Sequence, residues 1–169
     1  MLLPIGDFAI QERDFVKRIG GRLFETTSRF RAGVWSYGYS RYFDVSHVYS
    51  YPVDNWDTFT AHCNTKIWLE RDVPPNANDN EAITKLNEGR DKFHRTNCLI
   101  FFSARNSSSG LITLNPTKNV NLKVVVAVSL RGIDLSGMIV APKGVAVNAS
   151  LGFTEEDLNA IVRSVLSAF

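Results

Sequence analysis

The sequence of 169 residues contains only two cysteines and no long apolar run. No stretch reaches the roughly 18 uninterrupted apolar residues of a membrane-spanning helix, so we expect no membrane partner. The N-terminus lacks a basic segment followed by an apolar one, so we expect no signal peptide. We therefore expect an intracellular protein in which Cys63 and Cys98 are free thiols and the sequons at Asn106 and Asn148 stay unmodified.

The chain also lacks a basic arm. Its formal charge at pH 7 is +2, and its 19 Lys and Arg residues are interspersed with 17 acidic ones. A capsid protein that packages a genome usually concentrates basic residues at one end, because phosphate neutralisation supplies much of the binding free energy. We therefore expect no specific nucleic acid as a partner.

Glycine patterns for a phosphate loop, a dinucleotide site or a nucleophile elbow are absent as well. His94 and Cys98 have a plausible spacing for zinc, but the adjacent His62 and Cys63 are poorly placed to share one metal, so we predict no metal site. A Cys-dependent enzyme stays an alternative, because a histidine near either thiol would activate it. The candidate histidines are His47, His62 and His94. We predict that the chain is not an enzyme and that it needs no cofactor.

The first predicted helix spans residues 8–19 and ends at the glycine pair at 20–21, because glycine commonly terminates helices. One side of this helix is apolar and carries Phe8, Phe15 and Ile19. That side covers either the core of its own domain or a neighbouring subunit. These three residues are therefore the candidate self-assembly residues.

Two tyrosine-rich stretches alternate as strands do. They span residues 34–40 and 45–51, and they are predicted to pair through their aromatic side chains. The tyrosines on the shared face are Tyr37, Tyr39, Tyr49 and Tyr51. This aromatic stripe is either core packing or a stacking surface for bases or sugars.

Two further helices have clear start signals. Asn78 and Glu81 predict a capped helix that ends near Gly89, and Thr154 with Asp157 predicts a capping box at the start of a C-terminal amphipathic helix. The wide apolar stripe of that last helix must be buried, because exposing it would cost on the order of 10 kcal/mol. The pattern of residues 57–69 fits a strand or a helix equally well.

Short apolar runs separated by turn residues fill the second half of the chain. Residues 98–102 resemble a fully buried strand, and further strand candidates follow at 111–114, 120–130, 138–141 and 145–149. No helix is interleaved to suggest parallel crossovers. We therefore predict one mainly β domain over residues 1–169, with a helical arm at 1–21, an antiparallel β-sandwich at 34–150 and a helix at 154–169.

Four short stretches carry a family resemblance. They are Arg13-Asp14-Phe15 with Arg22-Leu23-Phe24; Val34-Trp35 with Tyr37 and Tyr39; Thr58-Phe59 with Ala61; and Arg90 and Lys92-Phe93-His94 with Ile100-Phe101-Phe102-Ser103. In this order and with these gaps, the chain resembles the cypovirus-type polyhedrins, which crystallise in infected insect cells as occlusion bodies around virions. The resemblance covers about half the chain, and the chain is shorter than the family's members.

The resemblance implies a jelly-roll sandwich that forms homotrimers and then a crystal lattice in the host cell cytoplasm, with virus particles as cargo. It implies a non-enzymatic protective matrix. Nucleotide binding belongs to the family too, but no residues of this chain match its nucleotide sites. The alternative within viral proteins is a small jelly-roll capsid or virion protein.

Polyhedrin crystals dissolve in the alkaline insect gut, and the composition suggests how this chain would respond. Above a pH of about 10.5 the Lys, Tyr and Cys side chains lose protons, which takes the formal charge from +2 towards about −12. Like-charged subunits would then repel one another. The candidate alkaline-sensitive residues are Tyr37, Tyr39, Tyr42, Tyr49 and Tyr51.

Overall fold

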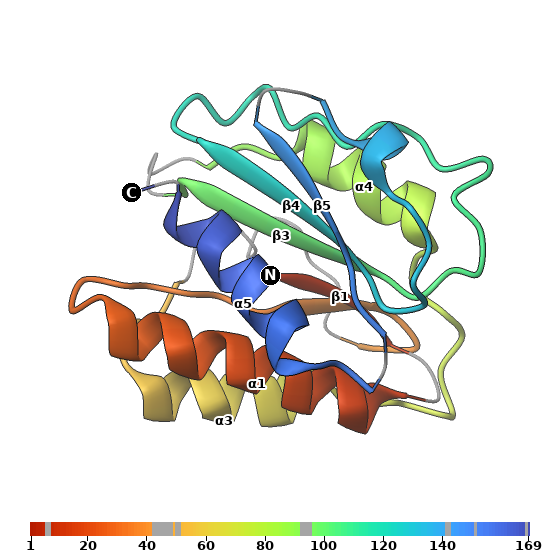
Figure 1. Cartoon of the computed structure of the whole chain (residues 1–169). Helices are drawn as coiled ribbons and strands as arrows, with labels where there is room; N and C mark the ends of the chain where they lie inside the picture. Colours follow the sequence, from red (N-terminus) through yellow and green to blue (C-terminus); the bar gives the residue numbers. More distant parts are fainter. Residues whose placement is uncertain are drawn as a thin grey trace.

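The computed structural model describes residues 1–5, 8–41, 49, 52–91, 96–140, 143–150, 152–167 and 169 (Figure 1). The strands are β1 (Leu2–Ile5), β2 (Trp35–Gly38), β3 (Cys98–Ser103), β4 (Val124–Ser129) and β5 (Gly144–Asn148). The helices are α1 (Ala9–Thr26), α3 (Trp56–Lys66), α4 (Asp79–Glu88) and α5 (Glu155–Leu166), with a short 3-10 helix, η1 (Ser136–Met138).

The five strands form one sheet in the order β2-β1-β3-β4-β5, and every neighbouring pair is parallel. The longest ladder joins β3 to β4, from Cys98 opposite Val124 to Ser103 opposite Ser129. This strand order is one of the two common orders of doubly wound α/β domains. The predicted antiparallel jelly-roll sandwich at 34–150 is therefore wrong.

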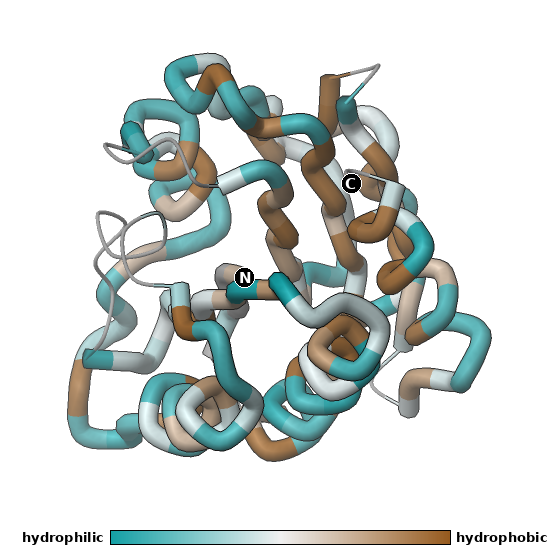
Figure 2. Tube along the Cα trace, turned by 90° about the vertical axis from the view of Figure 1, so that its left-hand side faces the viewer, coloured by the Kyte–Doolittle hydropathy of each residue, from teal (hydrophilic) through white to brown (hydrophobic). Residues whose placement is uncertain are grey.

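Helices cover both faces of the sheet (Figure 1). Helices α1, α3 and α5 contribute to the apolar core on one face, and α4 with η1 contributes to the core on the other. Strand β3 alternates between these cores: Ile100 and Phe102 point to the α1 side, while Leu99 and Phe101 point to the α4 side. Apolar residues gather along the strands accordingly (Figure 2).

The first strand in the sequence, β1, lies inside the sheet and not at its edge. Strand β1 lies between β2 and β3, so residues near the N-terminus are part of the sheet. Helix α1 then crosses the face of this same sheet, and Phe15 and Ile19 are buried in its core. Of the two alternatives for the apolar side of the first helix, the structure shows the core of its own chain.

Several predicted elements are confirmed and others are corrected. Helices α4 and α5 begin with the predicted capping boxes, and β2 and β3 lie within or close to the predicted ranges. Helix α1 continues to Thr26, so the prediction that it ends at the glycine pair at 20–21 is wrong. Residues 57–69 are mainly helical, and residues 111–114 form only an isolated bridge between Leu114 and Ile139. The second tyrosine-rich stretch lies largely outside the described residues.

The apolar stripe of α5 packs on the sheet as expected. Leu158, Ile161, Val162 and Val165 are buried, whereas Phe169 stays 63% exposed. Phe153, just before the helix, stacks on Phe15 of α1 with ring centroids 4.5 Å apart. Within the described ranges, no helix combines the length and apolar character needed to cross a bilayer.

Candidate functional site

The carboxyl ends of β1 and β3 mark the place where the chain changes faces. The connection after β1 runs through α1 on one face, while the connection after β3 contributes Leu114 and Leu122 to the core on the opposite face. In open α/β sheets, ligands bind outside the carboxyl ends of the strands at such a switch point. This edge of the sheet is therefore the first place to look for a site.

An acidic side chain of α4 lies at this edge. Asp79 is the first residue of α4, and its Oδ2 accepts a hydrogen bond of 2.5 Å from the hydroxyl of Ser103, the last residue of β3. Burial raises the pKa of Asp79, while the hydrogen bond from Ser103 and the charge of Arg105 act in the opposite direction. Asp79 as a whole residue is half-buried.

Tyr37 of β2 lies beside this acid. Its ring is buried and stacks on Phe101 with centroids 5.8 Å apart, and its hydroxyl donates to the carbonyl oxygen of Phe102 at 2.9 Å. Burial raises the pKa of Tyr37 well above its ordinary value, and the charges of Asp79 and Glu12 add to this shift. Tyr37 therefore stays neutral, and its hydrogen bond links β2 to β3, the strand on the other side of β1.

A second acid reaches the same edge from the first turn of α1. Glu12 is only 2% exposed, and its Oε2 has no hydrogen-bond partner among the described residues. Burial raises the pKa of Glu12 to about 8, although the charge of Arg131 lowers it in part. The guanidinium of Arg131 lies over the ring of Phe8, 4.8 Å from its centroid.

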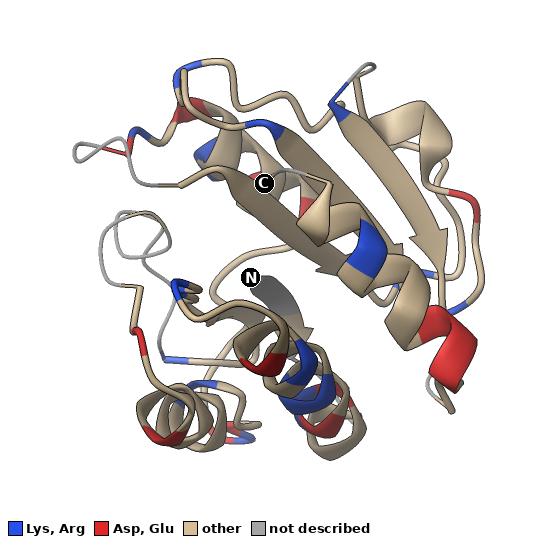
Figure 3. Cartoon of the chain, turned by 60° about the vertical axis from the view of Figure 1, so that its left-hand side comes forward, with Lys and Arg blue, Asp and Glu red and all other residues tan. Residues whose placement is uncertain are grey.

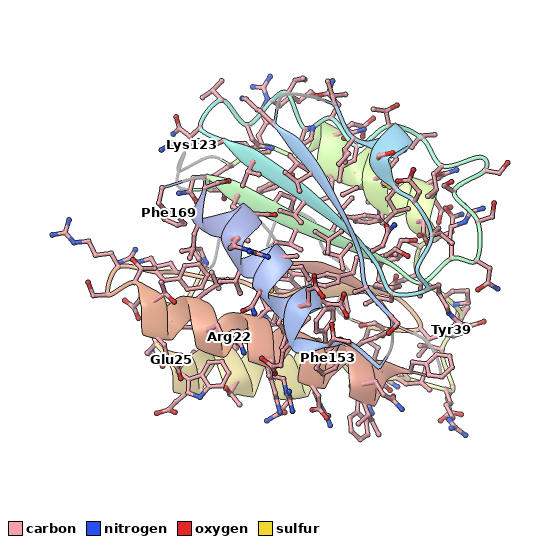
Figure 4. The ribbon with its side chains drawn as sticks, in the orientation of Figure 1. Arg22, Glu25, Tyr39, Lys123, Phe153 and Phe169 are labelled. Carbon is pink, nitrogen blue, oxygen red and sulfur yellow. The ribbon has the colours of Figure 1, made fainter. Side chains whose placement is uncertain are left out.

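Exposed side chains surround these buried groups. Ile10 in the first turn of α1 is 60% exposed, Tyr39 after β2 is 44% exposed, and Ile112 is 39% exposed. The amide of Ile112 donates to Asn80 Oδ1 at 3.0 Å, which places this loop beside the start of α4. Tyr39 projects from the end of the molecule where the strands terminate (Figure 4). We call this set, with Arg105 and Arg131, the carboxyl-edge surface.

A cavity of about 100 Å³ lies at the opposite edge, where β3 begins. Its apolar lining includes Leu23, Phe30, Ile100 and Val165. Drug-sized ligands occupy pockets of roughly 300–1,000 Å³. The cavity is therefore too small for such a ligand, and it brings no catalytic set of side chains together.

The predicted self-assembly and alkaline-sensitive residues have different surroundings. Phe15 and Ile19 are buried, and Phe8 is half-buried beneath Arg131. Tyr49 is buried and donates from its hydroxyl to the carbonyl oxygen of Leu86 at 3.1 Å. Tyr42 and Tyr51 lie outside the described residues. Of the three tyrosines that the structure describes, Tyr37 and Tyr49 are buried and Tyr39 is exposed.

The two thiols are poorly suited to act as nucleophiles. Cys63 is buried in α3 and Cys98 is half-buried at the start of β3. Burial raises the pKa of each thiol to about 12, so neither forms a thiolate near neutral pH. His62 is adjacent to Cys63 in α3, while His47 and His94 lie outside the described ranges. In the part of the chain that the structure describes, no His, Cys, Asp and Glu side chains group as a metal site would.

The two acids next to the carboxyl-edge surface, Glu12 and Asp79, were missed because they are far apart in the sequence. Neither residue belongs to a sequence motif that would single it out as part of a site. A parallel sheet would have placed the residues after β1, β2 and β3 together, but the strands were predicted to be antiparallel.

Comparison with protein families, with curated proteins and with solved structures finds no match to this chain.

Proposed function

We propose that this chain is a non-catalytic binding domain that recognises a partner protein through the carboxyl-edge surface. The observation that supports this most is the mixture of exposed side chains around Asp79. Tyr39, Ile10 and Ile112 supply apolar contact area. Tyrosine and arginine are enriched in protein interfaces, where a few large side chains carry most of the binding free energy.

A partner protein fits this edge better than a small molecule does. The elements that meet here are held by short polar contacts, such as the one between Ser103 and Asp79. The surface presents both signs of charge, from Arg105 and Arg131 and from the half-buried Asp79. Charges of both signs on an open surface favour specific recognition of a complementary protein surface.

The experiment is affinity capture with matched variants of the full chain. Tyr39→Ala and Arg105→Ala change the carboxyl-edge surface, while Val120→Ala changes a residue that is 70% exposed near the start of β4. We expect one partner to be retained by Val120→Ala and lost with both edge variants. Its direct binding to purified protein is then measured by titration. A partner that binds both edge variants as tightly as the original chain would contradict the proposal.

Self-assembly as the matrix of a viral occlusion body is our second candidate. The jelly roll that the resemblance implied is absent, so this candidate depends on the surface alone. Trp68 and Phe169 are 54% and 63% exposed, and they provide apolar contacts for other copies. Electron microscopy of expressing cells tests it: dense cubic inclusions are expected, and diffuse protein at high expression would contradict it.

A further inference from the structure

The two edge strands of the sheet, β2 and β5, differ in how their outer sides are covered. At the β2 edge, the amide of Gly38 donates to Asn76 Oδ1 at 3.0 Å, and the amide of Asn76 donates to the carbonyl oxygen of Gly38 at 2.8 Å. The side chain of Asn76 also donates to the carbonyl oxygen of Ser40. The segment around Asn76 therefore covers the end of this edge.

Strand β5 forms the other edge and uses only alternate residues to bind β4. The amide of Val125 donates to Lys143 at 2.8 Å, and the amide of Ala149 donates to Ser129 at 2.9 Å. In a parallel ladder, the residues between these positions that face β4 are the odd-numbered ones. The backbone groups of Gly144, Ala146 and Asn148 therefore point outward.

Most of these outward groups have no hydrogen-bond partner among the described residues. The amide of Gly144 donates to the carbonyl oxygen of Val140 at 3.0 Å, and the amide of Gly132 donates to the carbonyl oxygen of Ala149 at 3.0 Å. The described part of the neighbouring loop therefore bonds to β5 only near the two ends of the strand. In the described part of the chain, no strand lies beyond β5. The N–H and C=O groups of Ala146 and Asn148 are therefore open to another strand.

Natural edge strands usually carry a charge, a proline or a bulge that prevents such pairing. Residues 144–148 read Gly-Val-Ala-Val-Asn and contain neither a charged residue nor a proline. In Figure 3, which colours the ribbon by residue type, β5 carries the colour of uncharged residues. Asn148 is exposed and Gly144, Val145 and Ala146 are half-buried, so the strand is accessible at its outer side.

We propose that β5 pairs in antiparallel fashion with β5 of a second copy of this chain, about a two-fold axis beside Ala146. The sequence is symmetric about this residue, since a valine lies on each side of it. The pairing places Val145 opposite the partner's Val147, and β-branched residues form favourable cross-strand pairs. It also places Lys143 opposite the partner's Ala149, so like charges do not meet.

This symmetry is the reason to choose a second copy over a different protein. An isologous interface requires a patch that is complementary to itself, and a strand with a central alanine between two valines meets that requirement. Ala146 would exchange two hydrogen bonds with the partner's Ala146, and each Asn148 amide would donate to the partner's Gly144, giving about four bonds in total. A pairing of five residues buries little surface, so the dimer is reversible.

Sedimentation equilibrium over a concentration series tests the pairing. Ala146→Pro removes an amide that points away from β4, so the fold is kept while the central inter-chain bonds are lost. We expect reversible dimers for the original chain and at least about tenfold weaker association for Ala146→Pro. Val140→Ala, which changes an exposed side chain beside β5, is the control and is expected to dimerise normally. A monomer at every concentration, a larger assembly, or a dimer that Ala146→Pro does not weaken would overturn the proposal.

Amide exchange gives a second readout that needs no variant. The amides of Val145 and Val147 face β4 and are expected to be protected at all concentrations. The amides of Ala146 and Asn148 are expected to exchange rapidly in dilute protein and to become protected as concentration rises. Unchanged exchange at these two positions in a dimeric sample would show that another surface pairs. This test is independent of the proposed partner protein, because the carboxyl-edge surface is not involved.

Discussion

The hydroxyl of Ser103 donates a 2.5 Å hydrogen bond to the carboxylate of Asp79 and so joins the end of β3 to the start of α4. The same turn of α4 is fixed by its capping box, in which Asn78 and Glu81 bind each other's backbone amides. Asp79 is therefore held at the switch point of the sheet by two separate sets of contacts. The position of this acid is a property of the fold.

Ser103→Ala should destabilise the protein. Asp79 would lose the hydrogen bond from Ser103 in a half-buried position, which costs about 1–3 kcal/mol in the free energy of unfolding. Urea unfolding measures the effect. Ser108→Ala, in an exposed loop, is the control and should change stability by less than about 0.5 kcal/mol. Equal stabilities for the two variants would mean that the bond contributes nothing.

Glu12→Gln should stabilise the protein at alkaline pH. The pKa of Glu12 is raised by burial from 4.5 to about 8, so between these values the unfolded chain binds fewer protons than the folded one. Stability contributed by the neutral acid is present below pH 4.5 and is lost as pH rises through about 8. Glutamine keeps the shape without a charge, so we expect a gain of a few kcal/mol above that pH.

Thermal unfolding of Glu12→Gln at several pH values gives the measurement. The advantage of the variant over the original chain should grow with pH and should be largest above pH 8. Glu25→Gln changes an exposed acid in the same helix and should shift the melting temperature little at any pH. An advantage for Glu12→Gln that does not depend on pH would show that the acid is not buried as described.

The apolar character of the strands favours a parallel sheet, but the connections between the later strands lack the helices that usually accompany one. Residues 98–102 and 124–128 are continuous apolar runs, and strands buried on both faces in parallel sheets have this character. The connection between β3 and β4, however, contains no helix, and the described residues between β4 and β5 form only η1. The usual alternation of strand and helix is therefore missing from the second half.

Local signals predicted local structure well. The capping boxes at Asn78 and Thr154 are confirmed because their hydrogen bonds lie within four consecutive residues. The candidate site depends instead on the contact of Ser103 with Asp79 and on the charges of Asp79 and Glu12 that act on Tyr37. The spacing of these residues in the sequence does not show that they lie close in space. The site could therefore not be predicted without the strand order.

Alkaline pH should unfold the protein through its buried tyrosines. Burial raises the pKa of Tyr37 and of Tyr49, so above a pH of about 10 the unfolded chain loses protons that the folded chain retains. Stability is therefore complete below that pH and falls above it. Tyr49→Phe should lower stability by about 1 kcal/mol at neutral pH, through loss of the bond to Leu86, and should make the alkaline fall shallower.

Circular dichroism and tyrosinate absorbance, followed together in one pH titration, check this. We expect the buried tyrosines to ionise only as helical signal is lost. Ionisation of every tyrosine with the fold intact would contradict the mechanism. It would instead fit the charge repulsion between folded subunits that the composition suggested.

Gly20→Ala should destabilise the protein although alanine is the better helix former. A Cβ at Gly20 would overlap the ring of Phe59, because α1 and α3 pack closely at this point. Both residues are buried, so the ring has little room to move, and overpacking of this kind costs about 1–3 kcal/mol. Gly21→Ala is the matched control: its Cβ would lie 3.5 Å from Trp56, an ordinary contact, so helix propensity should stabilise it by up to about 1 kcal/mol. Thermal unfolding should therefore shift in opposite directions for two neighbouring glycines, and a gain in stability for both would mean that α3 does not rest on α1 at Gly20.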